Sequence, residues 1–480
     1  MAVTGRATEQ DADELSLRRL GYAQQLLRRM GGFESFALSF SVISILTGAV
    51  TLYGHGLSWG GPRVMLFGWP LVALLTLPVA ASLSQLASSY PTAGALYHWA
   101  AILGGRGWGF LTAWLNTIGQ AAITAGIDYG LAQFVAPMLG MPADRPHLVG
   151  ICAALLASHG ALNHLGVRAV ARLNSLSAWV HLAGVAAIVL GLWLFAPSQP
   201  AAFLLAAAPA PPAPAFAQGH AGLYGFLVGL LLAGWTFTGY DASAHGAEET
   251  HDATRNAPWG IVLSVAVSAI AGWALLVAVT LAIRDLPAAV AAENPFVHVL
   301  EGALGTRAGG ALVWVAMAAM WFCGLASVTS NSRMLFAFAR DGGLPFSAQL
   351  ARVSPRFRSP QVSVWTACAA ALAVALWSDA YAAMTALSTI ALYASYGVPI
   401  FLGLRARRSG RWQRRGPWDL GRFSGAVNLL ALLWIGGLVV LFVLPPNQLA
   451  GWTFGACLLV LGVAWRLRIR DRFRGPPASG

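Results

Sequence analysis

The chain has 480 residues, of which 57% are hydrophobic and 10% are charged, whereas soluble domains are about 45–50% apolar and 25% charged. This composition excludes a soluble globular protein of such length, because so little charge cannot cover so much apolar surface. The net charge is +12 and every basic residue is an arginine, but the arginines lie between hydrophobic segments, so membrane topology explains them and no nucleic-acid partner is expected.

A transmembrane helix needs roughly 20 largely apolar residues. Twelve stretches meet this requirement, so the sequence predicts an all-α integral membrane protein that crosses the lipid bilayer twelve times. The predicted spans are residues 36–54, 64–85, 107–136, 147–166, 173–195, 222–247, 258–283, 308–339, 361–377, 381–404, 424–444 and 450–467. Short interfacial helices are expected at 92–104 and 287–304, and the Pro-rich stretch 197–220 is expected to be an extended loop.

The arginines predict the orientation of these spans. With a cytoplasmic N-terminus, twelve alternating spans place 26 arginines inside and 4 outside, as the positive-inside rule requires. We therefore expect a multi-pass protein of the plasma or inner membrane with both termini in the cytoplasm. We expect an N-terminal tail at residues 1–35 and a ten-helix core at 36–404. A loop with two further helices is expected at 405–467, and a C-terminal tail at 468–480.

Two spans carry signals of a helix break at their centres. The first contains Thr47-Gly48-Ala49, and the sixth contains Phe237-Thr238-Gly239-Tyr240. Glycine weakens a helix, and threonine can satisfy the backbone groups that a break sets free. Paired broken helices are typical of secondary transporters that consist of two inverted repeats. If each repeat has five spans in this chain, the repeats cover about residues 36–195 and 222–404. The alternative is that both Thr-Gly pairs are ordinary helix-packing positions.

Facing breaks would suit a small zwitterion, because free N–H groups attract a carboxylate and free carbonyls attract an ammonium group. Asp241 follows the second break and could cap the next half-helix or contact a cationic substrate. Phe237 could act as a gate or stack on a substrate amine. The predicted substrate-binding residues are Thr47, Gly48, Ala49, Phe237, Thr238, Gly239, Tyr240 and Asp241.

Other polar residues within spans are candidates for ion coupling. His181 could load and release a proton near neutral pH, or could be a neutral histidine bonded to a neighbouring helix. Thr329 and Ser330 offer hydroxyl oxygens that suit sodium, or interhelical hydrogen bonds. Asp128 could line an outer vestibule or reach the interface.

A polar cluster lies at the cytoplasmic end of the sixth span, at residues 245–252, and consists of His245, Glu248, Glu249, His251 and Asp252. Its spacing matches no strong metal motif, and the four cysteines lie singly in apolar runs, so neither a metal nor another cofactor is expected. We predict instead an ion-pair gate of Glu249 with Arg333 or Arg340. No catalytic residues are expected, because transport involves no covalent chemistry. In a membrane enzyme only this cluster could serve, and the loops are too short to fold an active-site domain around it.

Several stretches resemble the amino acid–polyamine–organocation superfamily of permeases, and most closely its amino acid/choline branch. The resemblance covers residues 20–400 in order. It is carried by Leu20-Gly21-Tyr22, Leu46-Thr47-Gly48, Tyr90-Pro91-Thr92-Ala93-Gly94-Ala95-Leu96-Tyr97, Gly126-Ile127-Asp128-Tyr129, Thr238-Gly239-Tyr240-Asp241, Arg255-Asn256-Ala257-Pro258 and Arg340-Asp341-Gly342-Gly343-Leu344-Pro345.

This resemblance implies a five-plus-five inverted repeat with two extra C-terminal helices and substrate at the breaks of helices 1 and 6. It implies a permease for an amino acid or similar amine, with proton coupling at His181, where some proton-driven relatives have a lysine. Sodium coupling and exchange remain alternatives. A choline, polyamine or GABA substrate also remains an alternative, because many relatives have Gly-Ser/Ala-Gly where this chain has Leu46-Thr47-Gly48.

Overall fold

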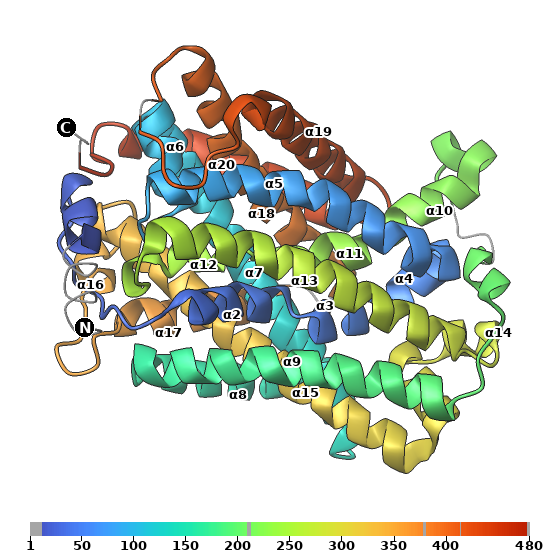
Figure 1. The fold of residues 1–480 in the computed structure, drawn as a ribbon. Helices are drawn as coiled ribbons and strands as arrows, with labels where there is room; N and C mark the ends of the chain where they lie inside the picture. The colour runs from blue at the N-terminus through green and yellow to red at the C-terminus, as the bar shows by residue number, and fades with distance from the viewer. Residues whose placement is uncertain (1–11, 209–212, 378–380, 413, 478–480) are drawn as a thin grey trace.

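The computed structural model describes residues 12–208, 213–377, 381–412 and 414–477, and these ranges form helices and loops without a strand (Figure 1). The first half of the chain contains α2 (Gly32–Ile43), α3 (Ile45–Thr51), α4 (Tyr53–Gly60), the π-helical turn η1 (Val64–Gly68), α5 (Trp69–Ser89), α6 (Leu96–Gly104), α7 (Arg106–Met138), α8 (Arg145–His164) and α9 (Val167–Phe195).

The second half follows after two 3-10 turns, η2 (Ala201–Leu205) and η3 (Ala215–His220). Its elements are α10 (Ala221–Gly229), α11 (Leu231–Thr236), α12 (Ala242–His245), η4 (Ala247–Glu249), α13 (Ala253–Leu281), α14 (Leu286–Ala291), α15 (Pro295–Arg340), α16 (Ser347–Leu350), α17 (Gln361–Trp377), α18 (Tyr381–Arg408), η5 (Gly421–Phe423), α19 (Ser424–Val443), α20 (Gln448–Ala464) and η6 (Trp465–Ile469).

All twelve predicted spans lie on these helices. Nine segments of the described residues are long and apolar enough to cross a membrane. The three others are α7 and α8, which have the length but are more polar, and α17, which has 17 residues. The structure therefore confirms an all-helical, multi-pass membrane protein, whereas the count of twelve crossings and the inverted repeat stay predictions.

The short elements differ in part from expectation. The stretch 92–104 contains the expected helix α6. The stretch 287–304 contains α14 and the start of α15, which leaves helical geometry at Gly305 (φ 81°). The prediction of an extended loop at 197–220 is wrong near both ends, where η2 and η3 form. Residues 209–212 of this stretch lie outside the described part. Residues 1–11 and 478–480 of the expected tails also lie outside it.

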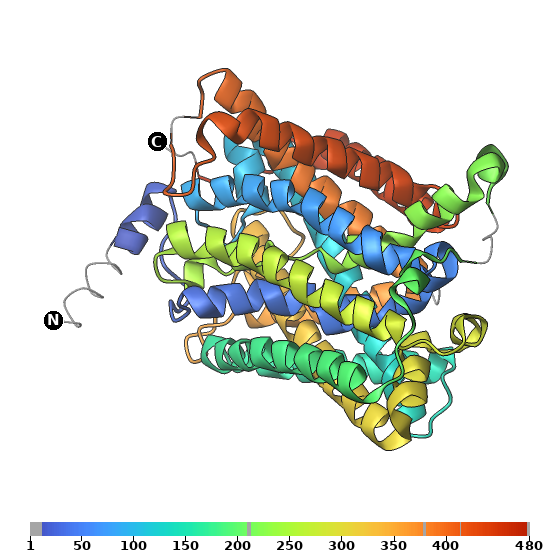
Figure 2. The same cartoon turned by 45° about the vertical axis from the view of Figure 1, so that its right-hand side comes forward.

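The long helices run side by side, and α7 packs against α18, α15, α6, α8 and α17 (Figures 1 and 2). The helix α2 packs against α13 and α9, while α19 lies against α5 and α18 at the edge of the bundle. Of the 18 most apolar consecutive residues in the last candidate span, 11% are buried, whereas 83% of the corresponding residues in the first span are buried. The two C-terminal helices are therefore peripheral, and the interrupted first helix belongs to the core.

Segments from both termini lie at the same end of the bundle, on the left of Figure 1. Gly21 packs against Pro477, and Arg414 of the 405–422 loop donates a hydrogen bond to Ser16 (3.1 Å). The helix α16 lies at this end as well, whereas α4 and α14 lie at the other. This arrangement agrees with an even number of crossings and gathers the arginine-rich segments on one side.

Candidate functional site

The first span is interrupted at Ser44, three residues before the predicted Thr47-Gly48 position. Ser44 has a left-handed backbone (φ 39°, ψ 87°) and separates α2 from α3. Its carbonyl accepts hydrogen bonds from the N–H groups of Thr47 (2.8 Å) and Gly48 (3.0 Å). Its hydroxyl contacts the Thr47 hydroxyl at 2.5 Å. The predicted helix break is therefore in the expected span but at Ser44 instead of Gly48. Gly48 is needed for close packing and not for backbone freedom.

The sixth span is interrupted where the sequence predicts it, between α11 and α12. Gly239 has a φ of 79°, which favours glycine. The Gly239 N–H donates to the Tyr396 hydroxyl (3.0 Å), and the Phe237 carbonyl accepts from the Tyr393 hydroxyl (2.8 Å). The Tyr240 carbonyl accepts from Ser39 on α2 (2.7 Å). The side chains of α18 and α2 thus satisfy backbone groups that the break leaves free.

The two interruptions lie against each other. A Cβ added to Gly48 would overlap the Thr236 side chain, and one added to Gly239 would overlap Val42. Between them lies a cavity of about 10 Å³, roughly room for one water molecule. It is lined by Val42, Ile43, Thr47, Gly48, Ile123, Ile127, Trp235, Thr236 and Cys323.

The predicted binding residues divide into two groups. Thr47 and Gly48 line the central cavity. Phe237 packs on Trp69 with ring centroids 4.8 Å apart and does not line the cavity, and the Thr238 hydroxyl donates to the Trp235 carbonyl (2.6 Å). All eight predicted residues are buried, Ala49 and Tyr240 included.

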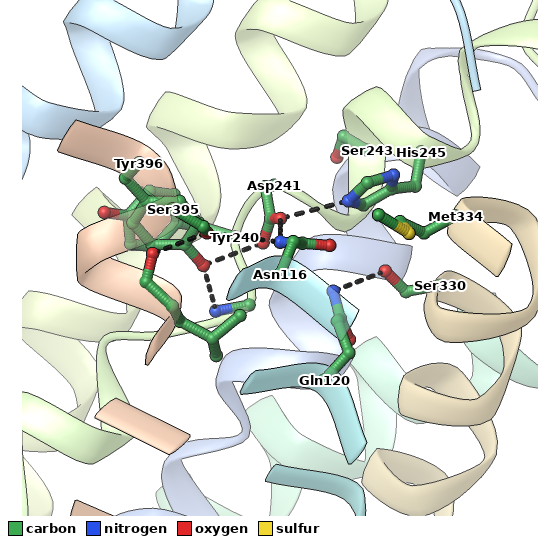
Figure 3. Close-up of polar contacts among 12 residues, drawn as sticks. Asn116, Gln120, Tyr240, Asp241, Ser243, His245, Ser330, Met334, Ser395 and Tyr396 are labelled. Carbon is green, nitrogen blue, oxygen red and sulfur yellow. Dashed lines mark hydrogen bonds and ion pairs between the residues drawn. The ribbon is translucent and has the colours of Figure 1, made fainter. Parts of the chain in front are cut away.

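Asp241 does not cap α12 through its side chain, which corrects that interpretation. Its carboxylate instead accepts hydrogen bonds from Tyr396 (2.8 Å) and Asn116 (3.3 Å), and it lies 3.1 Å from His245 Nε2 (Figure 3). The Tyr240 hydroxyl and Asn116 Oδ1 have no hydrogen-bond partner among the described residues. Since the second break therefore borders a buried carboxylate and a free acceptor oxygen, this region suits a cation.

His181 lies beside the first break. Its Nδ1 is 2.8 Å from the Ser177 carbonyl and its Nε2 is 2.6 Å from the Ser44 hydroxyl. A carbonyl only accepts, so Nδ1 carries the proton, and Nε2 of the neutral ring accepts from Ser44. The side chain is fully buried. The sequence placed this histidine within a span; the tertiary structure adds its contact with the residue that interrupts the helix.

The structure does not bring Thr329 and Ser330 to either break. The Thr329 hydroxyl donates to Asn163 on α8 (2.8 Å), and the Ser330 hydroxyl accepts from Gln120 on α7 (3.2 Å). The α15 residue that does reach the first break is Cys323, whose thiol donates to the Val42 carbonyl (3.4 Å). Asp128 neither lines the vestibule nor reaches an interface, since it is fully buried against His159.

Two buried ion pairs lie at the end of the bundle that holds the termini. Arg333 binds Glu249 through Nε (3.2 Å) and Nη2 (3.0 Å), which confirms the predicted contact. Arg340 binds Glu248 instead, at 2.8 and 2.9 Å. Burial alone would raise the pKa of Glu248, but the charge and hydrogen bonds of Arg340 and the Ala93 N–H lower it overall. Because these carboxylates and His245 bind different partners, the 245–252 cluster does not converge on one point.

The N-terminal segment reinforces this end. The N–H groups of Arg29 and Met30 donate to the Glu249 carbonyl (2.8 and 2.9 Å), and the His251 N–H donates to the Met30 carbonyl (2.8 Å). The Arg28 guanidinium binds the Thr250 carbonyl. The segment after the second break is thus tied to the start of the chain.

The opposite end is open. A vestibule of about 600 Å³ lies between α3, α4, the end of α7 and the region around α14, and its lining includes Thr51, Gln133 and Glu293. Thr51 donates a hydrogen bond to the Thr47 carbonyl (2.8 Å), and Thr47 lines the central cavity. The vestibule therefore ends one helical turn from the central cavity, while the ion pairs lie at the other end of the bundle.

Sequence reasoning missed several residues of this site. Tyr393 and Tyr396 reach the second break from α18, more than 150 positions away, and no local pattern indicated them. Asn116 was detectable, because it belongs to a polar series at four-residue spacing on α7, which continues with Gln120, Thr124 and Asp128.

Interrupted helices around a central cavity, with a vestibule at one end of the bundle and ion pairs at the other, are typical of a membrane transporter of the permease class. The chain belongs to the amino acid permease family, whose sequence model matches residues 30–465. The resemblance inferred from the motifs is thereby confirmed.

Individual relatives extend over nearly the whole chain. It is 35% identical to the amino-acid permease BAT1 homolog of Oryza sativa subsp. japonica, over 97% of this chain and 96% of that protein. It is 34% identical to the amino-acid permease BAT1 of Arabidopsis thaliana, over 91% and 89%. The GABA-specific permease of Saccharomyces cerevisiae is 26% identical, over 97% and 86%.

Proposed function

We propose that this chain is a secondary transporter that moves an amino acid or a closely related small amine across the membrane by alternating access. The observation that carries the proposal is the meeting of two interrupted helices at one cavity, which lies between an open vestibule and a closed end. Family membership supports amino acids as the substrate class.

The substrate binds between the two breaks. Its carboxylate lies near the start of α3, because the N-terminal end of a half-helix favours negative charge. Its ammonium group lies toward Asp241 and the unpartnered Asn116 Oδ1. Since the present cavity holds roughly one water molecule, binding requires the surrounding helices to move, and this movement is the conformational step of the cycle.

We propose proton coupling through His181, because a titratable ring that touches Ser44 can link protonation to the geometry of the break. Sodium coupling is less well supported, since the Thr329 and Ser330 hydroxyls are engaged with α8 and α7. The ion pairs Glu249–Arg333 and Glu248–Arg340 act as the gate on the cytoplasmic side.

The first test is thermal stabilisation of the purified protein by the twenty amino acids, GABA, choline and putrescine, with and without sodium, at pH 5.5 and 7.5. A ligand at 100 times its Kd stabilises the folded state by about 2.7 kcal/mol. We expect a zwitterion to bind without sodium. Stabilisation by choline or putrescine alone would overturn the zwitterion pose, and a requirement for sodium would overturn proton coupling.

The coupling residue is tested by His181→Gln in proteoliposomes. We expect uptake of the stabilising amino acid to lose its acceleration at pH 5.5, while exchange of internal for external amino acid persists. The control is His164→Gln, at the end of α8, which should keep the wild-type pH profile. An unchanged profile in His181→Gln would assign coupling elsewhere.

A further inference from the structure

A second pair of titratable groups is buried away from both breaks, between α7 and α8. Asp128 Oδ1 and His159 Nε2 are 3.1 Å apart, and both side chains are fully buried. Gly324 of α15 covers the pair so closely that an added Cβ would overlap Asp128 Oδ1 and lie 2.5 Å from His159 Nε2. Three helices therefore enclose a carboxyl and an imidazole at a point where only glycine leaves room.

Each residue of the pair has one polar atom that forms no hydrogen bond with the described residues. Asp128 Oδ2 and His159 Nδ1 have no hydrogen-bond partner among the described residues. A pair that served packing alone would be expected to have these atoms partnered, because buried polar atoms normally are. The free atoms leave places for a proton or for water when the helices separate.

His159 lies beside two groups that attract a cation. The Trp321 ring lies 5.3 Å from the imidazole, within the range in which an aromatic face attracts a cation. No arginine of the described residues forms an ion pair with Asp128, so only His159 can balance a carboxylate charge here.

Other titratable side chains lie near the pair. They are Tyr129 of α7, Cys152 of α8, Cys323 of α15 and Cys368 of α17. Thiols in apolar surroundings and phenols stay neutral near pH 7. Asp128 and His159 therefore determine the net charge of this site between them.

We propose that Asp128 and His159 form a second proton-binding site of the transport cycle, separate from His181. The loaded pair shares one proton between His159 Nε2 and Asp128 Oδ1 and has no net charge. Release of that proton to water leaves a carboxylate beside a neutral imidazole, with a net charge of −1. A desolvated negative charge is unfavourable, so the dry pair holds its proton more firmly than the hydrated pair and releases it more readily when one side hydrates.

The polar series on α7 connects this pair to the substrate site. Thr124 contacts Ser327 of α15 (2.7 Å), and Gln120 donates to Ser330 of the same helix (3.2 Å). One turn further along, Asn116 donates to Asp241 at the second break (3.3 Å, Figure 3). A change of charge at Asp128 thus acts on the row of hydrogen bonds between α7 and α15, and this row ends at the Asn116–Asp241 contact of the second break.

The proton alone is the first probe, and this test requires no substrate. A protonated imidazole quenches the fluorescence of a touching indole, so we compare wild-type protein with Trp321→Phe during a titration between about pH 8 and pH 5. We expect the fluorescence assigned to Trp321 by difference to fall at least about twofold, with the transition abolished in His159→Gln and moved to lower pH in Asp128→Asn. A flat difference signal between wild-type protein and folded Trp321→Phe would overturn the proposal, and this comparison does not require His159→Gln or Asp128→Asn to fold.

The second measurement follows protons in proteoliposomes with an entrapped pH dye, using the twenty amino acids and GABA as external substrates. This arm rests on the proposed function. We expect Asp128→Asn and His159→Gln to lower the number of protons moved per substrate at least twofold while amino acid exchange continues. An unchanged ratio would overturn the second site.

A matched control pair lies at the start of α8. Asp144 and His147 are 2.6 Å apart but exposed, and Asp144→Asn and His147→Gln should leave both the fluorescence titration and the proton ratio unchanged. The two proposals fail differently: if wild-type protein exchanges no amino acid at all, the proposed function fails, whereas the fluorescence titration still decides whether the pair binds a proton.

Discussion

Single atoms decide how closely the two interrupted helices approach. The three nearest atoms to a Cβ placed on Gly48 all belong to Thr236, two of them at 2.7 and 2.8 Å and the hydroxyl oxygen closer still. Substitution Gly48→Ala therefore overpacks the site, and overpacking typically costs about 1–3 kcal/mol. We expect a lower unfolding temperature and at least a tenfold loss of amino acid uptake, measured by thermal unfolding and by proteoliposome uptake.

The prediction for Gly48 has an internal rescue and a control. Thr236→Ala removes two of the three overlapping atoms, so Gly48→Ala/Thr236→Ala should recover part of the lost stability. Gly437 of α19 has open space around its Cβ position, so Gly437→Ala should leave uptake intact. Equal damage from Gly48→Ala and Gly437→Ala would contradict a packing role for the first break.

At the scale of elements, the Glu249–Arg333 pair joins the segment after α12 to the end of α15. Both side chains are 1% exposed. Removing one partner of a buried pair costs about 3–5 kcal/mol, because the other charge is left without compensation. We expect Glu249→Arg to abolish uptake and lower the unfolding temperature, and the exchanged pair Glu249→Arg/Arg333→Glu to restore part of both.

The exposed pair Glu14–Arg18 provides the comparison for this experiment. Its side chains are 40% and 66% exposed, and such pairs contribute only about 0.3–0.5 kcal/mol. Exchange of these two charges should therefore leave uptake and unfolding temperature nearly unchanged. If Glu249→Arg behaved in the same way, the buried pair would not act as a gate.

The neighbouring pair Glu248–Arg340 sets an expectation for pH. The pKa of Glu248 is lowered, despite the opposing effect of burial, by the charge and hydrogen bonds of Arg340. A carboxyl of this kind stabilises the folded state above its unfolded pKa of about 4.3, and the effect is lost as pH falls through the lowered folded value. The difference in unfolding temperature between wild type and Glu248→Gln should thus be equal at pH 5.5 and 7.5. A difference that changed within this range would show that the gate itself senses pH.

At the scale of the whole molecule, the vestibule and the ion pairs predict which residues solvent reaches from each side. In a Cys457→Ala background, Gln133→Cys lies in the vestibule, whereas Ser409→Cys is exposed at the end that holds the termini. We expect a membrane-impermeant maleimide to label Gln133→Cys on intact cells and Ser409→Cys only in inside-out vesicles. The reverse pattern would invert the predicted orientation.

The buried residue Ala247 tests the closed end in the same assay. It is 1% exposed, so Ala247→Cys should resist labelling in inside-out vesicles without substrate. Labelling should increase when a stabilising amino acid is added and the transporter cycles. Constant full labelling would contradict a closed end.

Long apolar runs and the arginines between them determined the all-helical membrane class and the positions of the spans, because lipid leaves the backbone few alternatives to helices. Motif spacing along residues 20–400 was enough to indicate the permease family. The two interrupted spans were indicated by glycine beside polar residues, since glycine weakens a helix, but the same pairs also fitted ordinary helix packing.

Only the tertiary structure decided which residue interrupts the first helix and which partners meet. Ser44 adopts the left-handed backbone because His181 and Thr47 hold its side chain, and these contacts come from the packing of α9 against α2. Asp128 pairs with His159, and Arg340 pairs with Glu248 instead of Glu249. A sequence records where charges and small residues lie along a helix, but hydrogen bonds between helices depend on their rotation and register, which the packing of the whole bundle determines.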